Sequence, residues 1–104
     1  MKTNMFKSII VLFVIISYYS CEVTSAFIRV TNDTEDFIYV TIGETDFRTI
    51  NPNKTSGYEN FDVGSYTVEV NDEYLCEINV STEDIDRSFT LHIYENSYEF
   101  EEEG

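Results

Sequence analysis

Positive charge is scarce in this chain. Six lysine and arginine residues stand against 20 aspartate and glutamate residues, and all the acidic residues follow Cys21. Four basic residues remain after Cys21, so this part of the chain carries a net charge of −16. Nucleic-acid binding needs a basic surface that neutralises phosphates, and adhesion to anionic lipid head groups needs one as well. We therefore expect no nucleic-acid partner, and little affinity of the acidic part itself for a membrane.

Histidine and cysteine are also scarce, which restricts the chemistry open to the chain. His92 is the only histidine, and Cys21 and Cys76 are the only cysteines. A catalytic histidine needs a nucleophile and an orienting acid within reach, and the sequence contains no Gly-x-Ser-x-Gly element to supply a nucleophile. A structural zinc site takes four histidine or cysteine ligands, one more than the chain offers from Cys21 onward. We predict no catalytic residue, no zinc site and no cofactor.

Carboxylates are plentiful, so calcium is the metal that needs separate consideration. Two acidic segments, residues 33–36 and 83–86, could lie close together on one rim of a β-sandwich. Neither follows the twelve-residue calcium loop with its central glycine and terminal glutamate. We interpret both segments as solvated turns and predict no metal site. A calcium-dependent or hydrolytic protein is the less favoured alternative.

Long hydrophobic runs are absent except at the N-terminus. Residues 8–16 are almost wholly aliphatic and follow Lys2 and Lys7. This run is less than half of the about 20 apolar residues that a membrane-spanning helix needs. A basic start, a short apolar core and small polar residues predict a secretory signal peptide over residues 1–20. A retained N-terminal anchor is the less favoured alternative.

The end of this signal resembles the lipobox of bacterial lipoproteins, because Ser20 places a small residue directly before Cys21. In that family the cysteine becomes the mature N-terminus and carries the lipid, so the resemblance implies lipidation of Cys21 and membrane anchoring through it. Tyr18 and Tyr19 depart from the usual pattern, which has leucine and then a small residue there. The competing cut, after Ala26, would release a soluble protein without Cys21.

The remainder of the chain has no apolar residues at helical spacing. It shows alternating apolar and polar residues between turns, which is typical of half-buried strands. We predict an all-β fold, a small antiparallel β-sandwich of about seven strands, immunoglobulin-like or transthyretin-like. A short tether (21–26), the sandwich domain (27–96) and a solvated acidic C-terminal tail (97–104) make up the expected exported protein. The expected strands are 27–31, 37–43, 46–50, 58–62, 65–71, 74–80 and 87–96.

Residues 62–70 are central to this prediction. Gly64 turns the chain, and Tyr66 then begins a strand with the order Asp-x-Gly-x-Tyr. This order resembles the tyrosine corner of β-sandwiches, in which the tyrosine hydroxyl bonds back to upstream backbone; an ordinary turn before a strand is the alternative. In the next strand, Cys76 alternates with Tyr74 and Ile78, so we expect Cys76 to be a small buried hydrophobe.

The segments Phe-Ile-Arg-Val-Thr-Asn, Ile-Tyr-Val-Thr-Ile-Gly, Asn-Pro-Asn-Lys-Thr-Ser-Gly-Tyr and Val-Gly-Ser-Tyr-Thr-Val together resemble small sandwich lipoproteins of Bacteroidota-type bacteria. The resemblance implies a cell-envelope location, at the outer membrane or in the periplasm, and no shared active site. Tyr39, His92 and Tyr94 lie on outward strand faces, where aromatic side chains stack on sugars or contact proteins. We therefore predict a non-enzymatic, lipid-anchored envelope domain with a binding or spacer role. A secreted soluble binding module is the alternative.

Overall fold

The structure is a computed structural model, and it describes residues 24–103. The predicted signal peptide and Cys21 lie outside the described residues, so the structure does not test these two predictions. The described part has eight strands and one short 3₁₀ helix, Thr82–Asp84, and it contains no α-helix. The strands are β1 (Ala26–Asn32), β2 (Ile38–Ile42), β3 (Thr45–Ile50), β4 (Glu59–Phe61), β5 (Gly64–Val70), β6 (Glu73–Val80), β7 (Ser88–Ile93) and β8 (Tyr98–Glu102).

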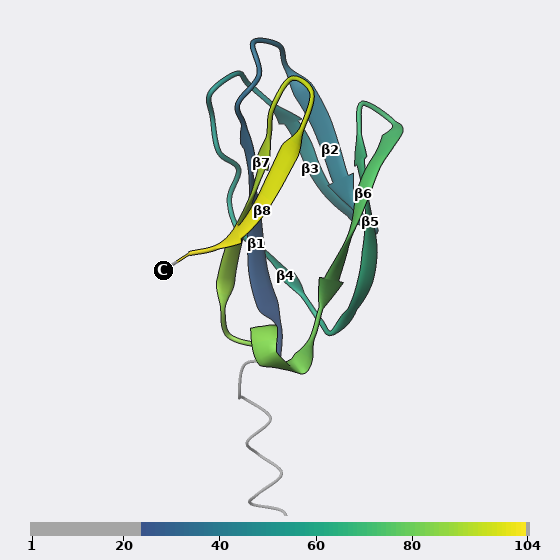
Figure 1. Ribbon diagram of the computed structural model, residues 1–104, viewed down its shortest axis with the longest axis vertical. Coiled ribbons are helices and arrows are strands. Elements are labelled where there is room, and N and C mark those ends of the chain that lie inside the picture. Colours follow the sequence, from purple (N-terminus) through teal and green to yellow (C-terminus); the bar gives the residue numbers. More distant parts are fainter. Residues whose placement is uncertain (1–23, 104) are drawn as a thin grey trace, which may run out of the picture.

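These strands form two four-stranded sheets (Figure 1). We call them the β1 sheet, with the order β4-β1-β7-β8, and the β2 sheet, with the order β3-β2-β5-β6. All described pairings are antiparallel except that of β1 with β7, which is parallel. The predicted all-β fold with two sheets is confirmed. The parallel pair departs from the wholly antiparallel expectation, because its two strands lie about 60 residues apart and no local pattern reports their direction.

One core lies between the two sheets, and the period-2 alternation of the sequence builds it. The inward residues of β1, β2 and β7 are buried, as their alternation predicts, and the least exposed of them show no accessible surface at all. The core members are Ala26, Ile28, Val30, Ile38, Val40, Ile42, Phe47, Ile50, Phe61, Val68, Cys76, Ile78, Val80, Phe89, Leu91 and Ile93. Without tryptophan, the core is filled mainly by branched aliphatic residues and three phenylalanines.

The C-terminal segment differs from the prediction of a solvated tail. Residues 98–102 form β8, which pairs antiparallel with β7 at the edge of the β1 sheet. Phe100 stacks on Phe89 with ring centroids 5.2 Å apart, while Glu99 and Glu101 stay exposed. The acidic residues therefore form the solvent face of a strand whose other face covers the core.

The start of the domain also differs slightly from the prediction. β1 begins at Ala26, and both Ser25 (6% exposed) and Ala26 (0% exposed) are buried. The Ser25 carbonyl oxygen accepts a hydrogen bond of 2.8 Å from the backbone N–H of Asp86. Ala26 pairs with Phe61 of β4. The last two residues of the expected tether therefore belong to the folded domain.

A β-bulge changes which side chains of β6 face the core. Val68 opposes Cys76, but Glu69 opposes Tyr74, so one extra residue lies on β6. The alternation predicted that Tyr74 shares the inward face with Cys76. Instead Tyr74 is 68% exposed, and Leu75 packs partly against the core. The extra residue shifts the side-chain phase by one, as bulges do.

The turns gather at two ends of the sandwich. The end where β1 starts also carries the 3₁₀ helix and the β4–β5 turn (Figure 1). The opposite end, which we call the distal end, carries the β1–β2 loop and the turns that join β5 to β6 and β7 to β8. Because β1 and β7 both run toward the distal end, their C-terminal residues meet there.

Candidate functional site

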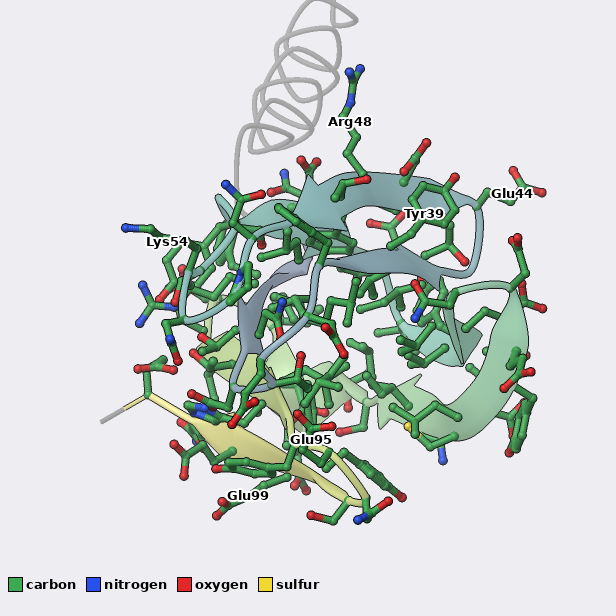
Figure 2. All side chains as sticks on the ribbon, turned by 90° about the horizontal axis from the view of Figure 1, so that it is seen from above. Tyr39, Glu44, Arg48, Lys54, Glu95 and Glu99 are labelled. Atoms are coloured by element: carbon green, nitrogen blue, oxygen red, sulfur yellow. The ribbon has the colours of Figure 1, made fainter. Side chains whose placement is uncertain are left out.

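The three residues expected to form one binding surface lie on opposite faces of the sandwich. Tyr39 is on the outer face of β2, in the β2 sheet, whereas His92 and Tyr94 lie on or directly after β7, in the β1 sheet. Figure 2 shows Tyr39 on one side of the molecule and Glu99 of β8 on the other. A shared surface of these three residues does not form. The reason is that the sequence pattern gives the face of each strand but does not say which sheet the strand joins.

His92 and Tyr94 do lie together. Their rings stack with centroids 6.1 Å apart and an interplanar angle of 10°. Burial tends to raise the pKa of the Tyr94 hydroxyl, and the carboxylates of Glu99 and Asp33 add to this rise. Tyr94 also donates a long hydrogen bond of 3.4 Å to Glu99. On the opposite face, the Asp46 carboxylate, 3.2 Å from the Tyr39 hydroxyl, raises the pKa of Tyr39.

His92 bridges two carboxylates. Its Nδ1 lies 3.0 Å from Asp33 Oδ2, and its Nε2 lies 3.1 Å from Glu101 Oε2. Partial burial works to lower the pKa of His92, but the hydrogen bonds to Asp33 and Glu101 outweigh it and the net pKa is raised. With a carboxylate on each ring nitrogen, neither nitrogen contacts a serine, threonine or cysteine nucleophile. The arrangement ties the β1–β2 loop to β7 and β8.

The region around Tyr66 has the bond that a tyrosine corner requires. The Tyr66 hydroxyl donates a hydrogen bond of 2.6 Å to the carbonyl oxygen of Asp62. Its ring meets Phe61 edge-on, with centroids 5.0 Å apart. Gly64 has φ +158°, and Gly43, at the turn between β2 and β3, has φ +62°. A Cβ on Gly43 would lie 2.8 Å from Cδ1 of Tyr66. These contacts give this region a structural role.

Cys76 lies inside the sandwich near one of its open edges. It is 7% exposed and forms no disulfide among the described residues. Burial raises the pKa of its thiol, although a hydrogen bond with Tyr98 acts in the opposite direction. A raised pKa disfavours the nucleophilic thiolate. The contact with Tyr98 also places β6 and β8, each at the edge of its sheet, next to each other.

The two acidic segments lie at opposite ends of the sandwich, and the expectation that they share a rim is wrong. Residues 33–36 follow β1 at the distal end, whereas residues 83–86 lie beside Ser25 at the start of β1. Their separation follows from the direction of β1, which runs from one end to the other. Within residues 24–103, no group of three or more histidine, cysteine or carboxylate side chains is placed to hold a metal ion.

A groove opens at the distal end between the β5–β6 and β7–β8 hairpins, and sequence reasoning missed it. Its volume is about 370 Å³. We call it the distal groove; its lining residues are Val70, Asn71, Glu73, Tyr74, Leu75, Ile93, Tyr94, Glu95, Asn96 and Ser97. It joins two hairpin tips that lie about 20 residues apart in the chain. The only available signal was the pair of aromatic residues, Tyr74 and Tyr94, placed at the two tips.

Comparisons with known proteins bear on the fold. No protein-family model and no curated protein sequence matches this chain. In the described residues, no helix is long and apolar enough to cross a membrane. Among solved structures, the chain is similar to the N-terminal domain of AlgF from P. aeruginosa, with 26% sequence identity and a TM-score of 0.61. The match covers 79% of this chain and 96% of that one, and it agrees with a small two-sheet β-sandwich.

Proposed function

We propose that this protein is a non-enzymatic cell-envelope domain, anchored by a lipid on Cys21, that binds a partner at its distal end. The observation that carries the anchor is the burial of Ser25 and Ala26. A cut after Ala26 would remove both residues, including the Ser25 carbonyl that Asp86 uses and the first pair of β1 with β4. A cut before Cys21 keeps them and leaves a linker of a few residues between the lipid and the fold.

The position of the anchor relative to the distal groove supports the binding role. The linker from Cys21 enters the sandwich at the end where β1 starts, and the groove lies at the opposite end. The seven residues of β1 extend over roughly 20 Å at the rise of a strand. A domain anchored at the end where β1 starts holds the groove on the side that faces away from the membrane. The net charge of −16 adds repulsion from anionic head groups, which favours this orientation.

The environment of His92 supports a non-enzymatic role. A general base needs a free ring nitrogen directed at a nucleophile or at substrate. Both nitrogens of His92 are bonded to carboxylates, and Cys76 has a raised pKa inside the core.

We also propose that the sandwich is of the immunoglobulin-like rather than the transthyretin-like type. The hydrogen bond from the Tyr66 hydroxyl to the Asp62 carbonyl oxygen is the one that defines a tyrosine corner. The resemblance to Bacteroidota-type lipoproteins agrees with this location.

The intact mass of the mature protein tests the anchor. We expect the full-length chain, expressed in a bacterium, to partition with the membranes and to begin at an acylated Cys21. Multiple acyl chains give stable anchoring, whereas one chain gives only marginal binding. Cys21→Ser should leave unprocessed precursor, and Cys76→Ser, as the matched control, should leave lipidation intact. A native N-terminus at Phe27, or membrane association without a lipid adduct at Cys21, would overturn the anchor.

A further inference from the structure

The distal groove combines apolar surface with exposed aromatic rings. Val70 and Leu75 of the β5–β6 hairpin pack partly on the core and also line the groove. The buried core residue Ile93 lines the groove as well. Tyr74 is 68% exposed and Tyr94 is 36% exposed. Exposed apolar surface of this kind, bordered by polar groups, is typical of interaction sites.

The charged residues that line the groove are all acidic. Glu73 and Glu95 belong to its lining, which contains no lysine or arginine. Glu99 lies beside Tyr94, since its carboxylate accepts a hydrogen bond from the Tyr94 hydroxyl. Figure 2 shows Glu95 and Glu99 together on this side, whereas Arg48 and Lys54 extend from other parts of the molecule. An anionic ligand would be repelled here, and a cationic one would be attracted.

The protein itself shows how tyrosine and glutamate hold an arginine. On the outer face of the β1 sheet, the guanidinium of Arg29 lies over the ring of Tyr58, 4.8 Å from its centroid. The same guanidinium pairs with Glu103 at 3.4 Å. Cation–π attraction combined with a carboxylate suits the planar guanidinium better than the compact ammonium of lysine. The distal groove offers the same two side-chain types, tyrosine and glutamate, with no arginine in its lining to occupy them.

The shape of the groove favours an extended chain over a small cation. β6 is an edge strand that pairs only with β5 among the described strands, and its first residues, Glu73, Tyr74 and Leu75, line the groove. Free strand edges bind extended peptides through backbone hydrogen bonds, while side chains enter the flanking pockets. We propose that the distal groove binds an extended, arginine-bearing segment of a partner protein. This inference rests on the binding role proposed above and names the class of the partner.

The test uses the full chain, purified in detergent, and a fluorescein-labelled nonapeptide of alternating arginine and glycine. Fluorescence anisotropy should show saturable binding. Tyr74→Ser and Tyr94→Ser should each weaken it by about tenfold, because each variant removes a ring that makes a cation–π contact with the arginine. The control Tyr58→Ser removes a tyrosine of similar exposure (43%) outside the groove, and we expect it to change binding by less than about twofold.

A second pair of variants separates the groove from the overall negative charge. Glu73→Gln with Glu95→Gln should weaken binding several-fold more than Glu44→Gln with Glu83→Gln, which remove the same charge from exposed sites outside the groove. Equal losses from both pairs, or no binding of the arginine peptide, would overturn the proposal. A neutral oligosaccharide that binds instead, and whose binding depends on Tyr74 and Tyr94, would also overturn it.

The same preparation separates the two proposals. The intact mass reports the lipid on Cys21, and the anisotropy reports the groove. A chain that lacks the lipid but binds the peptide contradicts the anchor alone. A lipidated chain that fails to bind the peptide contradicts the groove alone.

Discussion

Two regions of the distal end use their polar groups in opposite ways. On one side, Asn32 is fully buried, and its side chain donates hydrogen bonds to the carbonyl oxygens of Asp36 (2.8 Å) and Ile50 (2.9 Å). Its Oδ1 accepts bonds from both the backbone N–H and the hydroxyl of Thr34. On the other side, the distal groove leaves Tyr74 and the side chain of Asn96 exposed to solvent.

This difference separates structure from recognition. Every hydrogen-bonding position of the Asn32 amide serves the fold, because buried polar groups are costly unless they are paired. The side chain ties the β1–β2 loop to the end of β3. In the groove, the rings of Tyr74 and Tyr94 are exposed to solvent and are not part of the core. We therefore expect mutations in the first region to reduce stability and mutations in the second to leave it nearly unchanged.

The largest effect should come from Asn32→Ala. This change leaves the carbonyl oxygens of Asp36 and Ile50 without their side-chain partner, and it opens a small cavity. We expect a loss of about 3 kcal/mol in the free energy of unfolding, measured by denaturant titration. The matched control is Asn96→Ala in the groove, which should change stability by less than about 0.5 kcal/mol. Similar losses from both variants would remove the distinction between the two regions.

Gly43→Ala should have the next largest effect. Gly43 has φ +62°, a conformation that costs other residues about 1–2 kcal/mol. The new Cβ would also lie 2.8 Å from the Tyr66 ring, so we expect a loss of about 2 kcal/mol or more in thermal or denaturant unfolding. Gly64→Ala should cost less, because its Cβ would meet Tyr66 at 3.6 Å.

Gly57→Ala is the control for this series, since a Cβ there meets no atom within 4 Å. It should be neutral. A Gly43→Ala variant as stable as Gly57→Ala would show that the Tyr66 ring moves freely, which contradicts a fixed corner.

Tyr66→Phe isolates the hydroxyl bond of the corner. The variant keeps the edge-on contact with Phe61 and loses only the bond to the Asp62 carbonyl. We expect a loss of about 0.5–1.5 kcal/mol in the free energy of unfolding. Tyr58→Phe is the control, because the Tyr58 hydroxyl makes no hydrogen bond among the described residues while its ring still lies under Arg29. If both variants melt alike, the corner bond contributes nothing measurable.

Local patterns in the sequence predicted most of the strands and their inward faces. The alternation in β1, β2 and β7 needs only the period of a strand, so Ile28, Val40 and Leu91 were assigned to the core correctly. The tyrosine corner could also be predicted from the local residue order, because the hydrogen bond from Tyr66 to Asp62 joins residues only four positions apart.

Features that depend on distant partners could not be predicted in the same way. The acidic residues at the C-terminus predict a solvated tail, because their charge masks the alternation of Tyr98 and Phe100, which pair with β7 in β8. The alternation predicts that Tyr74 faces the core, because the bulge in β6 has no marker in the sequence. The candidate site was the least predictable part. The groove forms between two hairpin tips, and the sheet to which each strand belongs is a property of the whole fold.

The smallest expected effect concerns pH and the link between the two regions. His92 joins them, because it bonds to Asp33 in the loop after Asn32 and stacks on Tyr94 of the groove. Its pKa is raised in the folded state, although burial opposes the rise, because the bonds to Asp33 and Glu101 favour the imidazolium. A raised folded-state pKa means that folding is favoured by protonation of this group.

The contribution of His92 is therefore fully present below its unfolded pKa of 6.5 and is lost as pH rises through the folded-state value. We expect about 0.5–1 kcal/mol, typical of a partly exposed ion pair. Measured as the stability difference between the wild-type protein and His92→Gln, it should fall as pH rises from about 6 to 9. The difference removes the general charge repulsion that both proteins share. A constant difference across this range, or one that grows with pH, would show that the imidazolium does not hold the loop to the sheet.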